Sequence, residues 1–90
     1  MIKRSKVGHR GHEYNVVVYE DATMFFAQAL EKDFLAAGTT EDEAMNRLHE
    51  TINNSFLIGA ELGDPECAAI KPAPPTAWAM WHTGKRGEKD

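Results

Sequence analysis

The sequence predicts an α+β fold in which a three-stranded antiparallel sheet carries one long helix on one face. Three observations predict it: a run of β-branched and aromatic residues at Glu13–Glu20, a glycine-threonine turn at Gly38–Thr40, and apolar residues at helical spacing after it. Ninety residues with a hydrophobic fraction of 42% are enough for one small domain. We therefore expect the order strand, strand, strand, helix, and then a short C-terminal helix or strand.

The three strands are expected at Glu13–Glu20, Met24–Glu31 and Phe34–Ala37. A short polar connection separates the first two runs, which predicts a hairpin. Apolar side chains alternate onto both faces of the first strand, with Val16 on one face and Val17 on the other. Both faces of the sheet therefore need a cover. The long helix can supply one, and the second must come from the C-terminal segment or from another subunit.

A glycine turn and a capped helix start follow the third strand. Gly38 is expected to take a positive φ angle that turns the chain out of the strand. Thr40 is the predicted N-cap, and Glu43 stands three residues on, where a capping-box acid reaches back. The helix is expected from Glu41 to about Leu62, because Gly63 and the following Asp-Pro pair stop it. Its apolar face repeats at three- and four-residue steps through Met45, Leu48, Ile52, Phe56 and Gly59.

Residues 76–82 form either a short helix or a fourth strand. The pair Pro74-Pro75 suits the first turn of a helix, which would place Trp78 and Trp81 on one face, and we favour this assignment. An alternating apolar pattern through Ala77, Ala79 and Trp81 leaves the strand open.

Charge divides the chain into an N-terminal arm, a body and a tail. Residues 1–12 hold four Lys and Arg residues and no acid, and are expected to form a flexible basic arm. Residues 13–82 form the folded domain, and residues 83–90 a polar C-terminal tail. From Glu13 onward six Lys and Arg residues stand against fourteen acids, a net charge of −8. Such an acidic body suits a basic protein partner and argues against direct binding of nucleic acid.

The composition also limits the cellular setting and the chemistry. Cys67 is the one cysteine, so no internal disulfide forms, and we expect it to pack as a buried apolar residue. The N-terminus lacks the pattern of a signal peptide, and no apolar run reaches membrane-spanning length. A cytoplasmic protein without a membrane segment is the expectation. The four histidines show no convergent spacing, so neither a metal site nor a cofactor is expected.

Four residues of the turn carry a resemblance to a known family. Gly38, Thr40, Glu43 and Ala44 match the pattern Gly-x-Thr-x-x-Glu-Ala that opens the helix in the HicB-like antitoxin family, and the chain resembles that family over residues 14–58. The resemblance implies a truncated ribonuclease-H-like fold. It also implies a small basic ribonuclease toxin as the partner, neutralised by binding.

Two features depart from typical members of the family. The sequence Leu-Glu-Lys-Asp-Phe at 30–34 stands where they carry a proline-rich turn, and the chain is expected to leave no room for the DNA-binding module that usually follows the core. It looks more like the stand-alone HicB-like proteins. A stand-alone regulatory or ligand-binding domain without a toxin is therefore the alternative function.

Several acids are candidates for a metal-dependent nuclease site. These acids are Glu20 and Asp21, Glu31 and Asp33, and Glu41–Glu43. Ribonuclease-H chemistry needs an acid at the centre of the first strand, and this strand has none there. We favour turn and helix-dipole roles for them and expect no catalytic residue. A ribonuclease-H-like nuclease is the third, least favoured function.

Aromatic side chains are the candidate interface. Tyr19, Phe25, Trp78 and Trp81 either cover the second sheet face of their own subunit or anchor a partner, as aromatic residues often do. One long helix leaves a two-faced apolar sheet short of cover. We therefore expect a homodimer or a higher homo-oligomer, and a non-catalytic protein that acts through protein–protein interaction.

Overall fold

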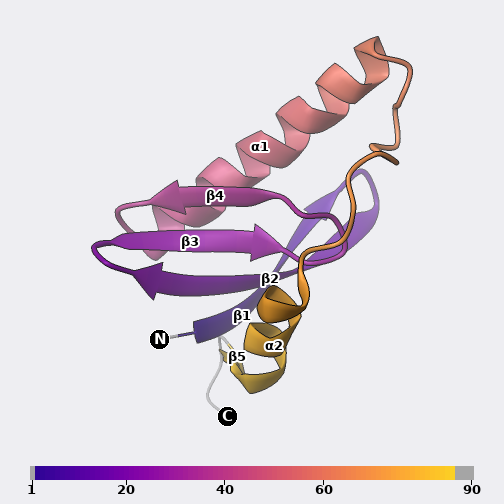
Figure 1. Cartoon of the computed structure of the whole chain (residues 1–90). Coiled ribbons are helices and arrows are strands. Elements are labelled where there is room, and N and C mark those ends of the chain that lie inside the picture. Colours follow the sequence, from indigo (N-terminus) through magenta and orange to yellow (C-terminus); the bar gives the residue numbers. More distant parts are fainter. Residues whose placement is uncertain (1, 87–90) are drawn as a thin grey trace.

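A five-stranded sheet forms the centre of the protein, with one helix on each face (Figure 1). The computed structural model describes residues 2–86, the side chains of 85 and 86 excepted. In chain order the elements are β1 (Ile2–His9), β2 (His12–Asp21), β3 (Met24–Ala29), β4 (Leu35–Gly38), α1 (Glu41–Glu61), α2 (Pro75–Thr83) and β5 (Lys85–Arg86). The α+β class and the long helix on an antiparallel sheet are confirmed, and the described sheet is wider than the three strands predicted.

The strand order in space is β4-β3-β2-β1-β5. Strands β1 to β4 pair antiparallel with their chain neighbours, while the two-residue β5 pairs in parallel with β1. Two-residue turns join β1 to β2 and β2 to β3, because His9 pairs with His12 and Asp21 pairs with Met24. β4 lies at the outer edge of the sheet, which leaves one side of that short strand without a neighbouring strand.

The basic arm predicted to be flexible is instead β1, so that prediction was wrong. Val7 is buried in the core, and the strand pairs along its whole length with β2. The turn explains why the chain folds back: Arg10 and Gly11 both have positive φ angles, of 52° and 81°, as a type I′ hairpin requires. The basic side chains remain at the surface of a paired strand, so charge alone did not indicate disorder.

The start of α1 confirms the cap and corrects the role of Gly38. The Thr40 side chain accepts a 3.0 Å hydrogen bond from the Glu43 backbone N–H, as an N-cap does. The Glu43 carboxylate reaches back to the N–H of Thr39, one residue before the cap, at 2.6 Å. Gly38 does not take a positive φ angle. It is needed for a different reason: a Cβ there would lie 2.6 Å from the backbone nitrogen of Ala44.

The end of α1 is a Schellman motif, as the glycine and proline signals predicted. Gly63 has a φ angle of 84°, and the Asp64 N–H donates to the Gly59 carbonyl at 2.7 Å. The 21-residue helix is about 31 Å long, and its C-terminal half extends past the sheet (Figure 1). The following loop therefore returns alongside the helix before it reaches α2.

Two cores lie on opposite faces of the sheet. α1 packs mainly against β4 and β3, and α2 mainly against β1 and β2. The larger core includes Val16, Leu48, Ile52 and Phe56, whereas the smaller one, below α2, is built from Val17, Leu30, Ala73 and Ala77. The prediction that both faces require cover is confirmed. The C-terminal segment supplies part of the second cover within the same chain.

Residues 76–82 are helical, which settles the alternative left open by the sequence. Pro75 occupies the first turn of α2, where the missing N–H of proline costs no hydrogen bond. The polar tail prediction was incomplete, because Thr83 belongs to α2 and Lys85–Arg86 form β5. Residues 87–90 of the predicted tail lie outside the described residues.

Candidate functional site

Part of the sheet face that carries α2 remains uncovered by that helix. Tyr19 of β2 stacks on Phe26 of β3, with ring centroids 5.5 Å apart and planes at 20°. Leu35 of β4 lies on the same face, because its register partner Gln28 pairs in turn with Val17. Leu35 is 49% exposed, and both aromatic rings are partly exposed. We call Tyr19, Phe26 and Leu35 the open sheet face.

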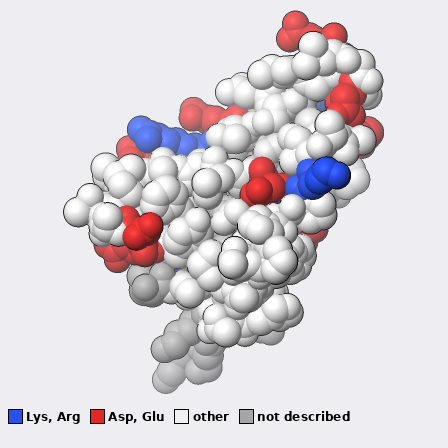
Figure 2. Space-filling model, in the orientation of Figure 1, with Lys and Arg blue, Asp and Glu red and all other residues white. Residues whose placement is uncertain are grey.

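Acidic side chains border the open sheet face. The Tyr19 hydroxyl contacts Gln28 Oε1 at 3.3 Å, and the Gln28 amide donates to Asp33 at 2.9 Å. Burial raises the pKa of Tyr19 above its ordinary value of 10.0, and the carboxylates of Asp21 and Asp33 raise it further. This side of the molecule is mostly uncharged in Figure 2, with acidic atoms at the end where β2 turns into β3 and a second acidic group, beside a basic one, nearer the middle. The result is an apolar centre with an acidic border.

The two tryptophans belong to α2 and pack on their own chain. Trp78 and Trp81 lie against the smaller core and stay partly exposed. The Arg4 guanidinium lies 5.4 Å from the Trp81 ring centroid and donates hydrogen bonds to the carbonyl oxygens of Trp81, at 2.6 Å, and His82, at 3.1 Å. Of the two interpretations weighed from the sequence, this arrangement favours a cover for the same subunit.

The predicted interface residues do not all meet. Tyr19, Trp78 and Trp81 share one side of the sheet, but Phe25 lies on the other face and packs against the larger core. Phe26 takes the place expected for Phe25, since it is the direct register partner of Tyr19. The alternation of side chains along a hairpin would have identified Phe26 once the two-residue turn at Ala22-Thr23 was recognised.

A second apolar surface lies at the projecting end of α1. Its exposed fractions are large: 48% for Leu57, 56% for Ile58 and 79% for Leu62. Ile58 and Leu62 are four residues apart and therefore neighbours on the helix surface. We call these three residues the helix-end patch. This patch was not predicted from the sequence. Leu57 and Ile58 lie off the apolar face of the helix, but the sequence does not show that the helix extends beyond the sheet.

Most acids weighed as a nuclease set have local structural partners. Glu31 accepts hydrogen bonds from the backbone and side-chain amides of Asn15, at 2.8 and 2.7 Å. Glu41 pairs with Lys3 at 3.0 Å. Hydrogen bonds from the backbone and then the side chain of Thr39 lower the pKa of Glu43 below its ordinary value. Within residues 2–86, no group of three or more His, Cys, Asp or Glu side chains is arranged to hold a metal ion.

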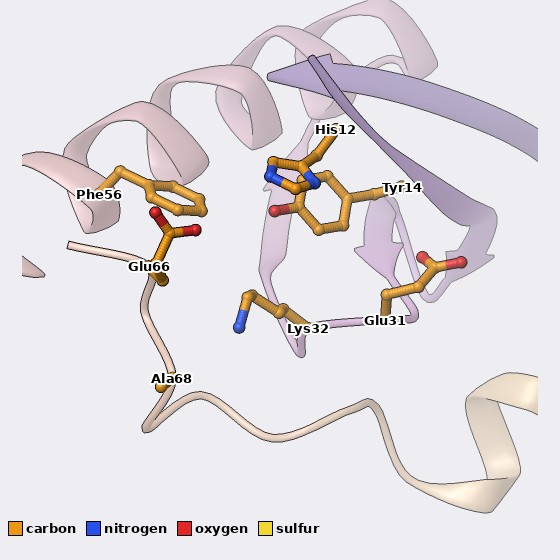
Figure 3. Close-up of a pocket in the computed structure, with 7 residues that line it drawn as sticks. All are labelled: His12, Tyr14, Glu31, Lys32, Phe56, Glu66 and Ala68. Atoms are coloured by element: carbon orange, nitrogen blue, oxygen red, sulfur yellow. The ribbon is translucent and has the colours of Figure 1, made fainter. Parts of the chain in front are cut away.

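A pocket of about 280 Å³ opens on the side of the larger core, beside the β1–β2 hairpin (Figure 3). Four segments meet there: β2, the connection from β3 to β4, α1, and the loop after α1. We call it the hairpin pocket; it is lined by His12, Tyr14, Glu31, Lys32, Phe56, Glu66 and Ala68. None of these was predicted as a binding residue. Their convergence depends on tertiary packing and leaves no local motif in the sequence.

The walls of the hairpin pocket are held by hydrogen bonds. The Lys32 ammonium group donates to the Cys67 carbonyl at 2.8 Å, which ties the β3–β4 connection to the loop after α1. Asp64 accepts hydrogen bonds from the N–H groups of Ala68 and Ala69, at 2.8 and 3.1 Å, and these lower its pKa. Cys67 is buried as predicted, and burial raises the pKa of its thiol.

Tyr14 is the central polar group of the hairpin pocket. Burial raises the pKa of its hydroxyl above 10.0, and the thiol of Cys67 and the carboxylates of Glu31 and Glu66 raise it further. The hydroxyl is therefore neutral at physiological pH and can donate a hydrogen bond. Its ring packs edge-on against Phe34, with centroids 6.1 Å apart, which fixes the direction in which the hydroxyl points.

Fold and surfaces together define a small α+β domain with one helix on each sheet face, an apolar surface bordered by acids, and a separate polar pocket. No family model, curated protein or solved structure matches the chain. None of the helices in the described part of the chain has the length and apolar character needed to cross a membrane.

Proposed function

We propose that the chain is a non-catalytic, HicB-like protein that acts by binding a small basic ribonuclease and neutralising it. The observation that carries this proposal is the open sheet face with Asp21 and Asp33 at its border. An apolar centre supplies the area that a stable interface buries, while surrounding acids attract a basic protein and speed its association.

Two sequence features support the same partner. The turn that contains Gly38, Thr40 and Glu43 matches the HicB-like pattern, and Thr40 caps the helix that follows it. The net charge of −4, ten Lys and Arg residues against fourteen acids, favours a basic protein over another acidic one.

We also propose that the chain self-associates through the helix-end patch. Leu57, Ile58 and Leu62 form an exposed aliphatic surface at the end of α1 that a second copy could bury. Two copies related by a two-fold axis would place the same side chains against one another. The open sheet face then stays free for the basic partner.

The test is affinity purification from the native host, followed by a ribonuclease assay on the recovered partner. We expect a small basic protein whose RNA cleavage the wild-type chain inhibits. The double variant Asp21→Lys/Leu35→Lys reverses one border charge and places another in the apolar centre. It should weaken inhibition at least about tenfold, since like charges and lost apolar area both oppose binding.

The control is Glu50→Lys, which makes the same charge reversal as Asp21→Lys at an exposed position of α1. It should inhibit like the wild type. Recovery of no basic protein, or equal inhibition by the double variant, would count against the proposal. Light scattering of Leu62→Glu tests self-association separately, and we expect a smaller mass than for the wild type.

A stand-alone ligand-binding domain is the second candidate function, because the hairpin pocket provides a formed cavity with polar groups. Its ligand chemistry can be inferred from the side chains that surround it.

A further inference from the structure

Tyr14 is only 4% exposed as a residue, yet none of the hydrogen bonds found among the described residues involves its hydroxyl. It points into the hairpin pocket (Figure 3). The hydroxyl is not among the fully buried polar atoms that lack a partner, so it faces the open space of the pocket. The fold therefore holds a donor in position for a group that enters the pocket from outside.

Two groups of opposite charge face the same space. In Figure 3 the Tyr14 hydroxyl points toward the Glu66 carboxylate, and the Lys32 ammonium lies below it. Lys32 uses one of its three donors on the Cys67 carbonyl and keeps two. The Glu31 carboxylate is negative as well, but two hydrogen bonds from Asn15 hold it against its own chain, so we assign an incoming ammonium group to Glu66.

The remaining wall is apolar. The ring of Phe56 and the methyl group of Ala68 line the pocket beside the ring of Tyr14. A volume of about 280 Å³ lies just below the range of about 300–1,000 Å³ typical of small-molecule sites. The occupant is therefore small, carries both charges, and has an apolar part.

We propose that the hairpin pocket binds a free α-amino acid with an aliphatic side chain. Lys32 and Tyr14 bind its carboxylate, Glu66 faces its ammonium group, and its side chain lies against Phe56. A monocarboxylate has no cation to place beside Glu66, and a simple amine has no anion to place beside Lys32. A zwitterion supplies both charges and therefore fits the pocket better than either. The site lies on the other side of the sheet from the open sheet face, and its test is independent of the proposed protein partner.

The experiment is a titration of the ¹⁵N-labelled full chain with L-leucine, followed by amide chemical shifts. We expect saturable shifts around Tyr14, Lys32 and Ala68, with a Kd on the order of 1 mM or tighter for so small a ligand. Two analogues provide the comparison. 4-Methylpentanoate lacks the ammonium group and 3-methylbutylamine lacks the carboxylate, and each should bind at least about fivefold more weakly.

Single substitutions separate the roles of the side chains. Tyr14→Phe removes only the hydroxyl and Glu66→Gln only the negative charge, and each should weaken leucine binding about five- to tenfold. Glu66→Gln should also bring leucine and 4-methylpentanoate to nearly equal affinity. Glu61→Gln, at an exposed position of α1 outside the pocket, is the control and should bind like the wild type.

Three outcomes would overturn the proposal. The first is the absence of saturable shifts up to roughly 20 mM leucine, far above the expected Kd. The second is equal binding of leucine and both analogues by the wild type. The third is unchanged leucine affinity in both variants when their spectra show the native fold.

Discussion

The guanidinium of Arg4 lies over the ring of Trp81 and donates a hydrogen bond to the carbonyl oxygen of the same residue, so one side chain joins β1 to α2. This contact connects the segment expected to be a free arm with the segment whose structure was left open. It also holds the helix that covers the smaller core.

The first prediction concerns this contact. Arg4→Met keeps an apolar stem but removes the cation and its two hydrogen bonds, and should destabilise the fold by about 1–3 kcal/mol. Urea unfolding followed by tryptophan fluorescence measures the loss, because both tryptophans lie on α2. Lys6→Met is the control: Lys6 makes one exposed ion pair, with Glu13 at 3.6 Å, and its loss should cost under about 1 kcal/mol. Equal costs for the two variants would contradict the role assigned to Arg4.

Gly38→Ala should destabilise the fold by about 2 kcal/mol or more. Its new Cβ would lie 2.6 Å from the backbone nitrogen of Ala44 and 2.8 Å from Glu43 Cβ, so β4 and α1 would have to separate. Gly8→Ala is the matched control, because the nearest atom to its Cβ is the His12 carbonyl oxygen at 3.8 Å, an ordinary contact. Thermal unfolding should show a large fall for the first variant and little change for the second.

Ala22→Gly should stabilise the protein. Ala22 has a φ angle of 57° in the β2–β3 turn, a region that costs a residue with a Cβ about 1–2 kcal/mol and glycine very little. Glycine also has a larger backbone entropy in the unfolded chain, which offsets part of this benefit. We therefore expect the free energy of unfolding, measured by chemical denaturation, to rise by about 0.5–1 kcal/mol. The same change at Ala60, exposed on α1, should lower stability by about 1 kcal/mol. A loss at both positions would show that the turn carries no strain.

His9 should make stability fall in mildly acidic solution. Burial lowers its pKa below 6.5, and the charges of Arg10, His12 and His49 lower it further. The folded chain thus favours the neutral ring, so stability is present above pH 6.5 and is lost as the pH falls toward the lower pKa of the folded state.

His9→Phe tests this pH dependence. The ring of His9 stacks on Phe56 with centroids 4.7 Å apart, and its buried Nε2 has no hydrogen-bond partner among the described residues. The variant keeps the stacking and removes the unpaired nitrogen, so it should gain about 1 kcal/mol at neutral pH and more below pH 6 or so. Denaturation curves between about pH 7 and pH 5 measure both effects. A constant difference across that range would contradict the assignment.

Local rules predicted much of the fold. The helix start at Thr40 and its end at Gly63 are set by capping chemistry that acts within a few residues, and both agree with the structure. The strand β1 was missed because its charges suggested a solvated arm, while the turn signal at Arg10-Gly11 that pairs it with β2 was not used. Gly38 was recognised as essential, but its close approach to Ala44 depends on how β4 packs against α1.

The candidate sites were less predictable. Tyr19 was identified from its aromatic character, but its neighbour on the open sheet face is Phe26 rather than Phe25, a difference of one residue in strand register. The hairpin pocket joins His12 to Glu66 across most of the chain, and no pattern in the sequence marks residues that meet only after folding.

The contact between Arg4 and Trp81 spans 77 positions, which has a consequence for synthesis on the ribosome. β1 leaves the ribosome well before α2, because the segments between them must be made first. The α1 side of the sheet can close earlier, while Val17 and Leu30 stay exposed to other proteins until α2 arrives. A chain truncated before Pro75 would keep this surface open permanently, and we expect it to be a target for chaperones and proteases.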